Sequence, residues 1–543
     1  MEKYLTEQID SLFTPWNRTD TPGCVLGIFQ DGRISYTKAY GMANLEYGLA
    51  LTPDSLMYLA SNSKQFMAAC VMLLVQQGLV SLSDDIRKYF PEMPEYPHPV
   101  RVEHILNHTN GWREHGYLSF LAGMSDLDYR TADSVAMICR QSGVNYPAGE
   151  TYLYSNAGFV LQAELVQRVT GQALPSFTRQ NLFEPLGMRS TVFSDDHGLV
   201  LKNRAASYEP AENGGYRCLL AANSVLGSAG VLTTVEDLYR WDQNFYDARV
   251  GGPEFIRLMT TPAHFNDGRQ VPYSAGLIHS EICGQKAISH GGVEFGYRSN
   301  TLRFPERRLS IMCLANLSTF RPAEISEQIA GLLLSEQKPV FVRSPKPQPQ
   351  PLSTAVVEGA SGFYYDSVTG AFARLPDQDG HLWASAAGFN FEPELVTHSI
   401  TPEKETFTLE YEDRAEAFLM RFTLEKAHAA FGWTLLPVMM ECSLPALAQT
   451  PVADAAALNP EEFAGRFYCA DVKALYETAV VDGRLSLVNL TGLRGELSAG
   501  PADVFTRGGW SLHFTRAGDG RVDGFRLWNL SVRGLRFERI EVR

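Results

Sequence analysis

The 543-residue sequence has no apolar run that could cross a bilayer, since the longest, residues 66–75, is about half of the roughly 20 residues required. It is also short of positive charge. The formal net charge is −14, which disfavours nucleic acid and anionic membranes as partners, because both are bound through basic surfaces. Residues 1–13 lack the basic start and apolar core of a secretory signal. We therefore expect no nucleic-acid partner, no membrane partner and a cytoplasmic location.

Motifs typical of metal sites and of phosphate-binding loops are missing as well. The eight cysteines form no CxxC pair, and most lie in apolar stretches, which predicts reduced core thiols. The sequence contains no GxxxxGK[ST], no HExxH and no GxSxG motif. His104 and His108 are four residues apart, but no third ligand accompanies them, so we interpret them as hydrogen-bonded structural residues.

A proline-rich segment divides the chain. Proline at the density found in residues 338–352 sustains neither a helix nor a central strand and forms an extended connector. After it, the sequence Gly-Phe-Tyr-Tyr at 362–365 resembles Gly-Arg-Phe-Tyr at 465–468. Each copy is followed, 17 positions after its first residue, by an Asp-Gly turn, which indicates a repeated β module. We predict a catalytic domain over 1–337, a linker over 338–352, and β-barrel domains over 353–450 and 451–543.

Before the linker, strand and helix signals alternate. Asp31-Gly32 predicts a hairpin, because this dipeptide accepts the backbone angles of a tight turn. A helix that is apolar nearly all round, and therefore buried, is followed by an amphipathic helix that Gly171 ends. Hairpin strands beside long helices indicate an α+β domain with a largely antiparallel sheet. The predicted elements are the hairpin 25–38, the helices 65–77 and 159–170, and the strands 300–304 and 309–314.

The pattern Ser-x-x-Lys occurs three times, and only Ser61 with Lys64 lies at the entry to the buried helix. On a helix, residues i and i+3 share one face. The apolar surroundings would disfavour the ammonium form of Lys64 and lower its pKa, so that it could take a proton from Ser61. The alternative is that Ser61 only caps the helix.

Two downstream segments carry further candidate groups. If residues 154–156 are extended, Tyr154 and Asn156 point the same way, and a phenol near an ammonium has a lowered pKa and can relay a proton. Residues 287–293 predict a short strand in which Gly291 and Gly292 leave room for a substrate backbone beside His290. The alternatives are a buried tyrosine and a glycine-rich bulge.

Taken in this order, Ser61-x-x-Lys64, Tyr154-x-Asn156 and His290-Gly291-Gly292 resemble the three motifs of the penicillin-recognising serine hydrolases, a superfamily that includes the class C β-lactamases. The resemblance covers about residues 5–335, and within the superfamily it is strongest to the D-aminopeptidases. It implies an α+β, β-lactamase/transpeptidase-like catalytic domain with an all-helical part, followed by two small antiparallel β-barrel domains.

The resemblance also implies site roles. Ser61 is the nucleophile, Lys64 and Tyr154 share the proton transfers with the general base left open, and no metal or organic cofactor is needed. Backbone N–H groups of Ser61 and Val293 form the oxyanion hole. Asn156 binds the substrate amide or the lysine. His290, Gly292, Val293 and Arg298 complete the substrate-binding set, with Arg298 as a candidate for gripping a carboxylate.

The chemistry that fits best is a D-stereospecific aminopeptidase or amidase acting on small peptides or amides. His290 replaces the lysine that most class C β-lactamases carry, and a neutral imidazole grips a carboxylate more weakly. The alternatives are an esterase of family VIII type, a D-alanyl-D-alanine carboxypeptidase or β-lactamase, and a non-catalytic acyl-binding sensor. Besides the small-molecule substrate, a homodimer is kept open as a partner.

Overall fold

The structure is a computed structural model. It describes residues 2–124, 129–220 and 224–334, residue 360 and the strands between 362 and 450, and residues 459–540 apart from 489–492, 501–502, 508 and 530. A seven-stranded sheet, antiparallel throughout, forms the centre of the first part. Its strands, in spatial order, are β10 (Tyr273–Ser274), β11 (Leu277–Ile282), β12 (Gln285–Glu294), β13 (Tyr297–Phe304), β14 (Leu309–Ala315), β1 (Cys24–Gln30) and β2 (Arg33–Tyr40).

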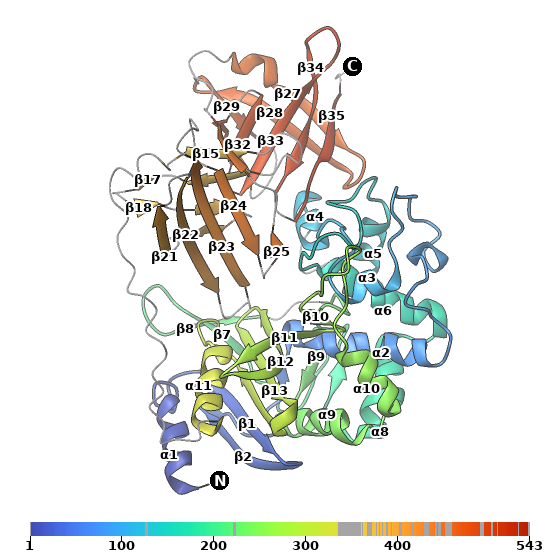
Figure 1. The fold of residues 1–543 in the computed structure, drawn as a ribbon, viewed down its shortest axis with the longest axis vertical. Coiled ribbons are helices and arrows are strands. Elements are labelled where there is room, and N and C mark those ends of the chain that lie inside the picture. The colour runs from blue at the N-terminus through green and yellow to red at the C-terminus, as the bar shows by residue number, and fades with distance from the viewer. Residues whose placement is uncertain are drawn as a thin grey trace.

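Both faces of this sheet are buried at the neighbouring strands β14 and β1, which explains why these two strands are apolar at most positions. Along β1, Leu26 and Ile28 join a core formed with α1 (Lys3–Leu12) and α11 (Pro322–Leu334). The alternate residues Val25 and Phe29 join the larger core on the other face, which includes α9 (Val235–Asp247). Figure 1 shows α1 and α11 on one side of the sheet and α9 on the other.

The helical part lies beside the face covered by α9. Its central helix α2 (Lys64–Gln76) is buried along almost its whole length, as predicted, and the amphipathic helix α6 (Asn156–Thr170) ends at Gly171, whose φ of 71° is left-handed. The other helices are α3 (Val102–Leu106), α4 (His115–Leu121), α5 (Thr131–Cys139), α7 (Leu174–Thr178), α8 (Glu184–Leu186) and α10 (Gly252–Thr260), with short turns η1 (Ala60–Ser63), η2 (Ile86–Lys88), η3 (Arg179–Phe183) and η4 (Pro305–Arg307).

Short strand pairs complete this part of the chain. The predicted hairpin is β1 and β2, with Asp31 and Gly32 at positive φ, and the predicted strands 300–304 and 309–314 lie within β13 and β14. The small strands are β3 (Met42–Asn44), β4 (Leu49–Ala50), β5 (Met57–Tyr58), β6 (Val192–Phe193), β7 (Ser207–Pro210), β8 (Tyr216–Leu219) and β9 (Val231–Thr233).

Two antiparallel sheets follow. The first contains β15 (Gly362–Tyr365), β16 (Phe372–Leu375), β19 (Ala384–Ala386), β20 (Phe389–Phe391), β21 (Glu394–Ile400), β22 (Lys404–Asp413), β23 (Phe418–Ala427), β24 (Thr434–Met439), β25 (Cys442–Ser443) and β26 (Leu447–Thr450), with β17 (Asp377–Gln378) and β18 (His381–Leu382) as a separate pair. The second follows the turn η5 (Pro460–Phe463) and contains β27 (Gly465–Cys469), β28 (Ala474–Val481), β29 (Arg484–Leu487), β30 (Gly495–Glu496), β31 (Ser498–Ala499), β32 (Val504–Arg507), β33 (Trp510–Arg516), β34 (Val522–Trp528) and β35 (Leu535–Ile540).

The two sheets share one topology. In each, the first strand pairs with the last strand of the same sheet, as β15 pairs with β26 and β27 with β35. The edge strands of each sheet are neighbours in sequence, namely β20 and β21 in the first sheet and β30 and β31 in the second. A sheet with this order curls into a nearly closed barrel. The fold class predicted from the sequence is thus confirmed, and the common topology supports the predicted repeat.

The second barrel packs against the helical part, beside α4 (Figure 1). Arg113 lies buried at this contact and bonds Asp471 Oδ2 across it at 3.0 Å. The backbone N–H of Glu114 donates to the Ser531 carbonyl at 2.9 Å, and Tyr476 Oη donates to the Leu121 carbonyl at 3.0 Å. A loop of the second barrel is therefore fixed to the residues that precede α4.

Some of the predictions lie outside the described residues. The linker 338–352 falls among them, and the domain boundaries stay predictions. Cys24, Cys70, Cys139, Cys313 and Cys469 are buried free thiols as expected, whereas Cys218 and Cys283 are exposed. In the described part of the chain, no helix has the length and apolar character needed to span a membrane.

Candidate active site

Ser61 and Lys64 lie together at the entry to α2. Ser61 is in the 3₁₀ turn η1 rather than on the helix proper, and Lys64 is the first residue of the helix. The Lys64 amine is 3.0 Å from Ser61 Oγ and donates a second hydrogen bond, of 2.8 Å, to the Ser228 carbonyl. The structure therefore brings the predicted nucleophile into direct contact with one of the two residues predicted to share the proton transfers.

The Lys64 side chain is completely buried. Its burial lowers the pKa of Lys64 to about 7, against the opposing influence of the carboxylates of Glu114 and Glu294. No ion pair to Lys64 occurs among the described residues. A lysine in this state is about half unprotonated near neutral pH, which is the condition for accepting a proton from a serine hydroxyl.

Tyr154 lies over the amine. Lys64 Nζ is 4.8 Å from the centre of the Tyr154 ring, and the ring itself is partly exposed. On the same ring packs the imidazole of His108, with 4.3 Å between ring centres. Ser61 and Lys64 thus come from one segment, and the Tyr154 ring comes from a distant segment to lie against the amine. The proton transfers among them stay predictions.

The turn that carries Ser61 is held from below by buried polar side chains. Asn62 donates to Ser299 Oγ at 2.8 Å and accepts from Thr301 Oγ1 at 2.9 Å, and both partners lie on β13. Ala60, directly before the nucleophile, has a φ of 49°, which is rare for a residue with a side chain. Strain of this kind persists where the surroundings hold the backbone in place. Here the contacts that hold the turn also hold Ser61 in position.

The third motif runs along this turn as the strand β12. A Cβ on Gly292 would come within 2.1 Å of the Leu59 carbonyl and 3.2 Å of the Asn62 nitrogen. Only glycine therefore allows the strand this close to Ser61. Val293 follows on the same strand, paired in register with Arg298. This approach is what an oxyanion hole formed by Ser61 and Val293 requires, and that role stays a prediction.

His290 is a buried, neutral side chain. Burial, followed by the nearby Lys64 amine, lowers its pKa to about 3. Its Nδ1 lies 2.6 Å from the Gly291 carbonyl, and its Nε2 lies 3.0 Å from Tyr273 Oη. Since a carbonyl only accepts, Nδ1 carries the hydrogen and Nε2 accepts from Tyr273. His290 thus supports the strand and offers no positive charge to a substrate carboxylate.

Arg298 and Asn156 are placed differently from the expectation. Arg298 is partly buried, and its Nη1 donates to the carbonyls of Phe295 and Tyr297 in the turn between β12 and β13. Asn156 is the first residue of α6, because the extended conformation ends at Ser155. The two hydrogen bonds of Lys64 within the described residues go to Ser61 and Ser228, and neither goes to Asn156.

Sequence reasoning missed Glu114, which reaches the site from the segment before α4. Its Oε2 accepts the backbone N–H of Asn156 at 2.7 Å, and the carboxylate is close enough to Lys64 to influence its pKa. A single acid in an irregular segment gives no motif. Ser228 was also missed as a partner of Lys64, from which it is 164 positions away in the sequence.

The part of the chain that forms this site matches a known protein family. The family model described as Beta-lactamase matches residues 7–334. The chain belongs to the beta-lactamase family. This match confirms the superfamily predicted from the three motifs and, with the relatives that follow, the enzyme class, a serine hydrolase.

The similarity to individual relatives extends over the two barrels as well as the catalytic part. A D-aminopeptidase of Cereibacter sphaeroides (strain ATCC 17029 / ATH 2.4.9) is 25% identical, and the match covers 96% of each chain. A D-aminopeptidase of Gluconobacter oxydans (strain 621H) is 23% identical over 96% of each chain. The predicted likeness to D-aminopeptidases is confirmed over almost the full length.

Solved structures share the family fold. The octameric penicillin-binding protein homologue from Pyrococcus abyssi matches with a TM-score of 0.56 and 20% identity, over 82% of this chain and 100% of that one. The D-amino acid amidase from Ochrobactrum anthropi SV3, complexed with L-phenylalanine amide, matches with a TM-score of 0.51 and 22% identity, over 61% of this chain and 99% of that one. At such identities the likeness shows the fold alone.

Proposed function

We propose that this protein is a D-stereospecific aminopeptidase or amidase that releases N-terminal D-residues from small peptides or amides. Ser61 attacks the carbonyl carbon and forms an acyl-enzyme, which water then hydrolyses. Lys64 takes the serine proton, and Tyr154 and Lys64 pass a proton to the leaving amine. Preference for the D-configuration is supported by the names of the full-length relatives, which are D-aminopeptidases.

The free amine of the substrate is the part for which the structure offers a partner. Glu114 is a buried carboxylate whose Oε1 makes no hydrogen bond among the described residues. The nearest basic group is His115 Nε2 at 3.4 Å, but burial lowers the pKa of His115, so the imidazole is neutral. Glu114 is close enough to Lys64 to influence its pKa but forms no ion pair with it among the described residues. A substrate ammonium would give this buried carboxylate a directly bonded cation.

This observation separates the proposal from its alternatives. An esterase has no need of a carboxylate that binds an amine. A carboxypeptidase or β-lactamase needs a cation for the substrate carboxylate, yet His290 is neutral and Arg298 Nη1 bonds to backbone carbonyls. The group that the site offers is an anion, which favours a substrate with a free ammonium.

The test compares D-alanine p-nitroanilide with its N-acetylated form and with the L-enantiomer. We expect turnover of the free D-compound, loss of turnover in Ser61→Ala, and a preference for the free amine that falls on the order of tenfold or more in Glu114→Gln, since a charge-assisted bond is lost. Glu103→Gln is the matched control, because Glu103 is a half-exposed acid that pairs with Arg101. Equal cleavage of free and acetylated substrates by the wild-type enzyme would refute the proposal.

A cytoplasmic location is part of the proposal. It is supported by the seven described cysteines, which are all free thiols, as is usual in a reducing compartment. Fractionation of the native host, with detection of the chain by antibody, tests it, and recovery in an exported fraction would overturn it.

A further inference from the structure

His108 contacts the site but has no role in the chemistry described so far. It follows the short helix α3 and has a φ of 58°. Thr109 N–H closes the end of that helix on the His104 carbonyl. Glycine or asparagine is usual at the left-handed position after a helix, because other side chains are strained there. A histidine at this place therefore has a cost that packing of the helix end does not explain.

The backbone and ring of His108 bracket Tyr154. The His108 carbonyl accepts the N–H of Leu153 at 3.0 Å, and His108 Nδ1 accepts the N–H of Ser155 at 3.0 Å. These two bonds hold the backbone N–H groups of the residues directly before and directly after Tyr154. The left-handed φ turns the carbonyl and the ring of one residue toward the same extended segment.

The imidazole then packs on the phenol ring itself. The ring centres of His108 and Tyr154 are 4.3 Å apart with an angle of 32° between planes. Lys64 Nζ lies 4.8 Å from the centre of the same phenol ring. His108 also packs at 4.5 Å against Tyr273, the residue that donates to His290. One side chain thus touches both Tyr154 and the support of the third motif.

His108 is fully buried. Its Nδ1 lies 3.0 Å from the backbone nitrogen of Ser155 and 3.2 Å from the Ser155 carbonyl oxygen, so the backbone of Ser155 holds this side of the ring. Among the described residues Nε2 has no hydrogen-bond partner, which costs stability. Burial, with Lys64 and His290 nearby, lowers the pKa of His108 well below its usual value, so the ring adds no charge beside Lys64.

We propose that His108 is a positioning residue, which fixes the Tyr154 phenol above the Lys64 amine and keeps water away from that amine. A small residue at this place would remove the ring that packs on Tyr154 and would open a path for water to Lys64. The lysine would then be better solvated, and its ammonium form would be favoured.

The test measures the pH dependence of kcat/KM for p-nitrophenyl acetate, which has no group that titrates near neutrality. In the wild-type enzyme we expect activity to fall with decreasing pH below about 7, because only the unprotonated Lys64 accepts the serine proton. The ionisable groups that face Lys64 are His108, Glu114, His115, Tyr154, His290 and Glu294.

The variants are His108→Asn and His108→Gly, which both tolerate the left-handed backbone. Each removes a neutral ring, so the charges around Lys64 stay the same and only its solvation changes. We expect kcat to fall on the order of 10- to 100-fold, as for a misplaced catalytic group, and the acid limb to move to higher pH. Far-ultraviolet circular dichroism checks folding, and two variants guard against failure of one to fold.

His104→Asn is the matched control. His104 is a buried histidine on the short helix that precedes His108, and its Nδ1 accepts the N–H of Arg101 outside the site. An acid limb that stays at its wild-type pH in both folded His108 variants would overturn the proposal, whatever their melting temperatures. Because the ester carries no amine, this result is independent of the preference for free amines that tests the proposed function.

Discussion

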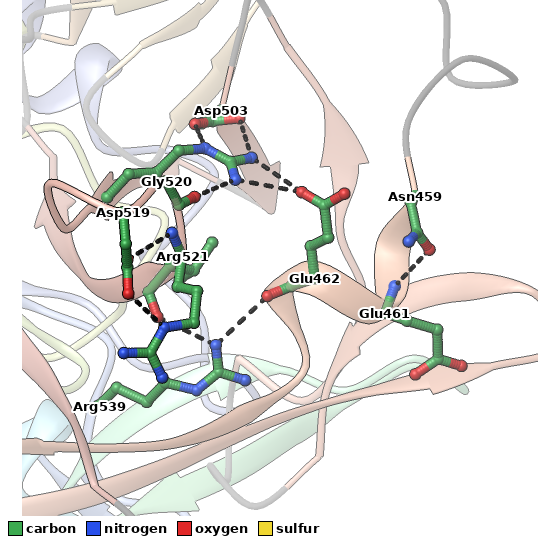
Figure 2. Close-up of polar contacts among 10 residues, drawn as sticks. Asn459, Glu461, Glu462, Asp503, Asp519, Gly520, Arg521 and Arg539 are labelled. Atoms are coloured by element: carbon green, nitrogen blue, oxygen red, sulfur yellow. Dashed lines mark hydrogen bonds and ion pairs between the residues drawn. The ribbon is translucent and has the colours of Figure 1, made fainter.

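Two regions of the molecule hold positive charge in opposite ways. At the candidate active site, Lys64 is completely buried and has no ion-pair partner among the described residues. On the second barrel, Arg516 is about one-third exposed and binds two carboxylates, those of Asp503 and Glu462. Figure 2 shows these two acids and the neighbouring Asp519, Arg521 and Arg539.

The two surroundings move the pKa in opposite directions. Burial lowers the pKa of Lys64 to about 7, whereas the hydrogen bonds that Arg516 donates to Asp503 raise the pKa of Arg516. The first group can lose its proton at neutral pH, and the second never does. Proton transfer therefore belongs to the buried lysine that has no ion-pair partner among the described residues. The arginine cluster ties the turn η5 to β33 and to the residue before β32, through contacts that water screens.

The largest effect is expected at Lys64. Lys64→Arg keeps the positive charge, but a guanidinium does not deprotonate in a protein, so proton transfer from Ser61 is lost. We expect kcat/KM for D-alanine p-nitroanilide to fall on the order of 1,000-fold, within the range known for general bases. Lys64→Met tests the same point without the added bulk. Lys88→Arg, at an exposed lysine paired with Asp84, should retain activity. Activity within tenfold of wild type in Lys64→Arg would show that Lys64 is not the base.

The buried half of this comparison could be predicted from the sequence. Ser61 and Lys64 stand at the start of an apolar run, and that run alone implies a desolvated amine. The strand with His290, Gly291 and Gly292 was predicted for the same local reason, since glycines leave room beside a strand. Periodicity and spacing are local properties of a sequence, so the helix and the strand that they define could be predicted.

What the sequence did not show depends on contacts between distant segments. Glu114 accepts a hydrogen bond from the N–H of Asn156, and His108 accepts hydrogen bonds from Leu153 and Ser155. In each case the partner is more than 40 positions away in the sequence. The conformation of Asn156 was also missed, although Ser155, the residue directly before the helix, is of a type preferred at helix N-termini. Pairings of this kind follow from the tertiary fold and have no spacing of their own.

A smaller effect is expected where a buried charge does have a partner. Asp471→Asn removes the counter-charge of Arg113 at the contact between the second barrel and the helical part. Losing one member of a buried pair leaves the other charge uncompensated, so we expect the free energy of unfolding of the full chain to fall by about 3 kcal/mol. Urea unfolding followed by tryptophan fluorescence measures it. A change below about 0.5 kcal/mol would mean that water reaches Arg113 in the folded protein.

The smallest effect is expected in the exposed cluster. Arg516→Gln removes the contacts to Asp503 and Glu462, but surface ion pairs contribute little because water and salt screen them. We expect the free energy of unfolding to fall by no more than about 1 kcal/mol, with the difference from wild type shrinking as salt is raised, and no change in kcat/KM. Urea unfolding at low and at high salt provides the measurement. A loss of unfolding free energy as large as that in Asp471→Asn, and unaffected by salt, would mean that the cluster acts as a buried network. The two regions would then differ in whether the cation has an ion-pair partner, and not in how exposed it is.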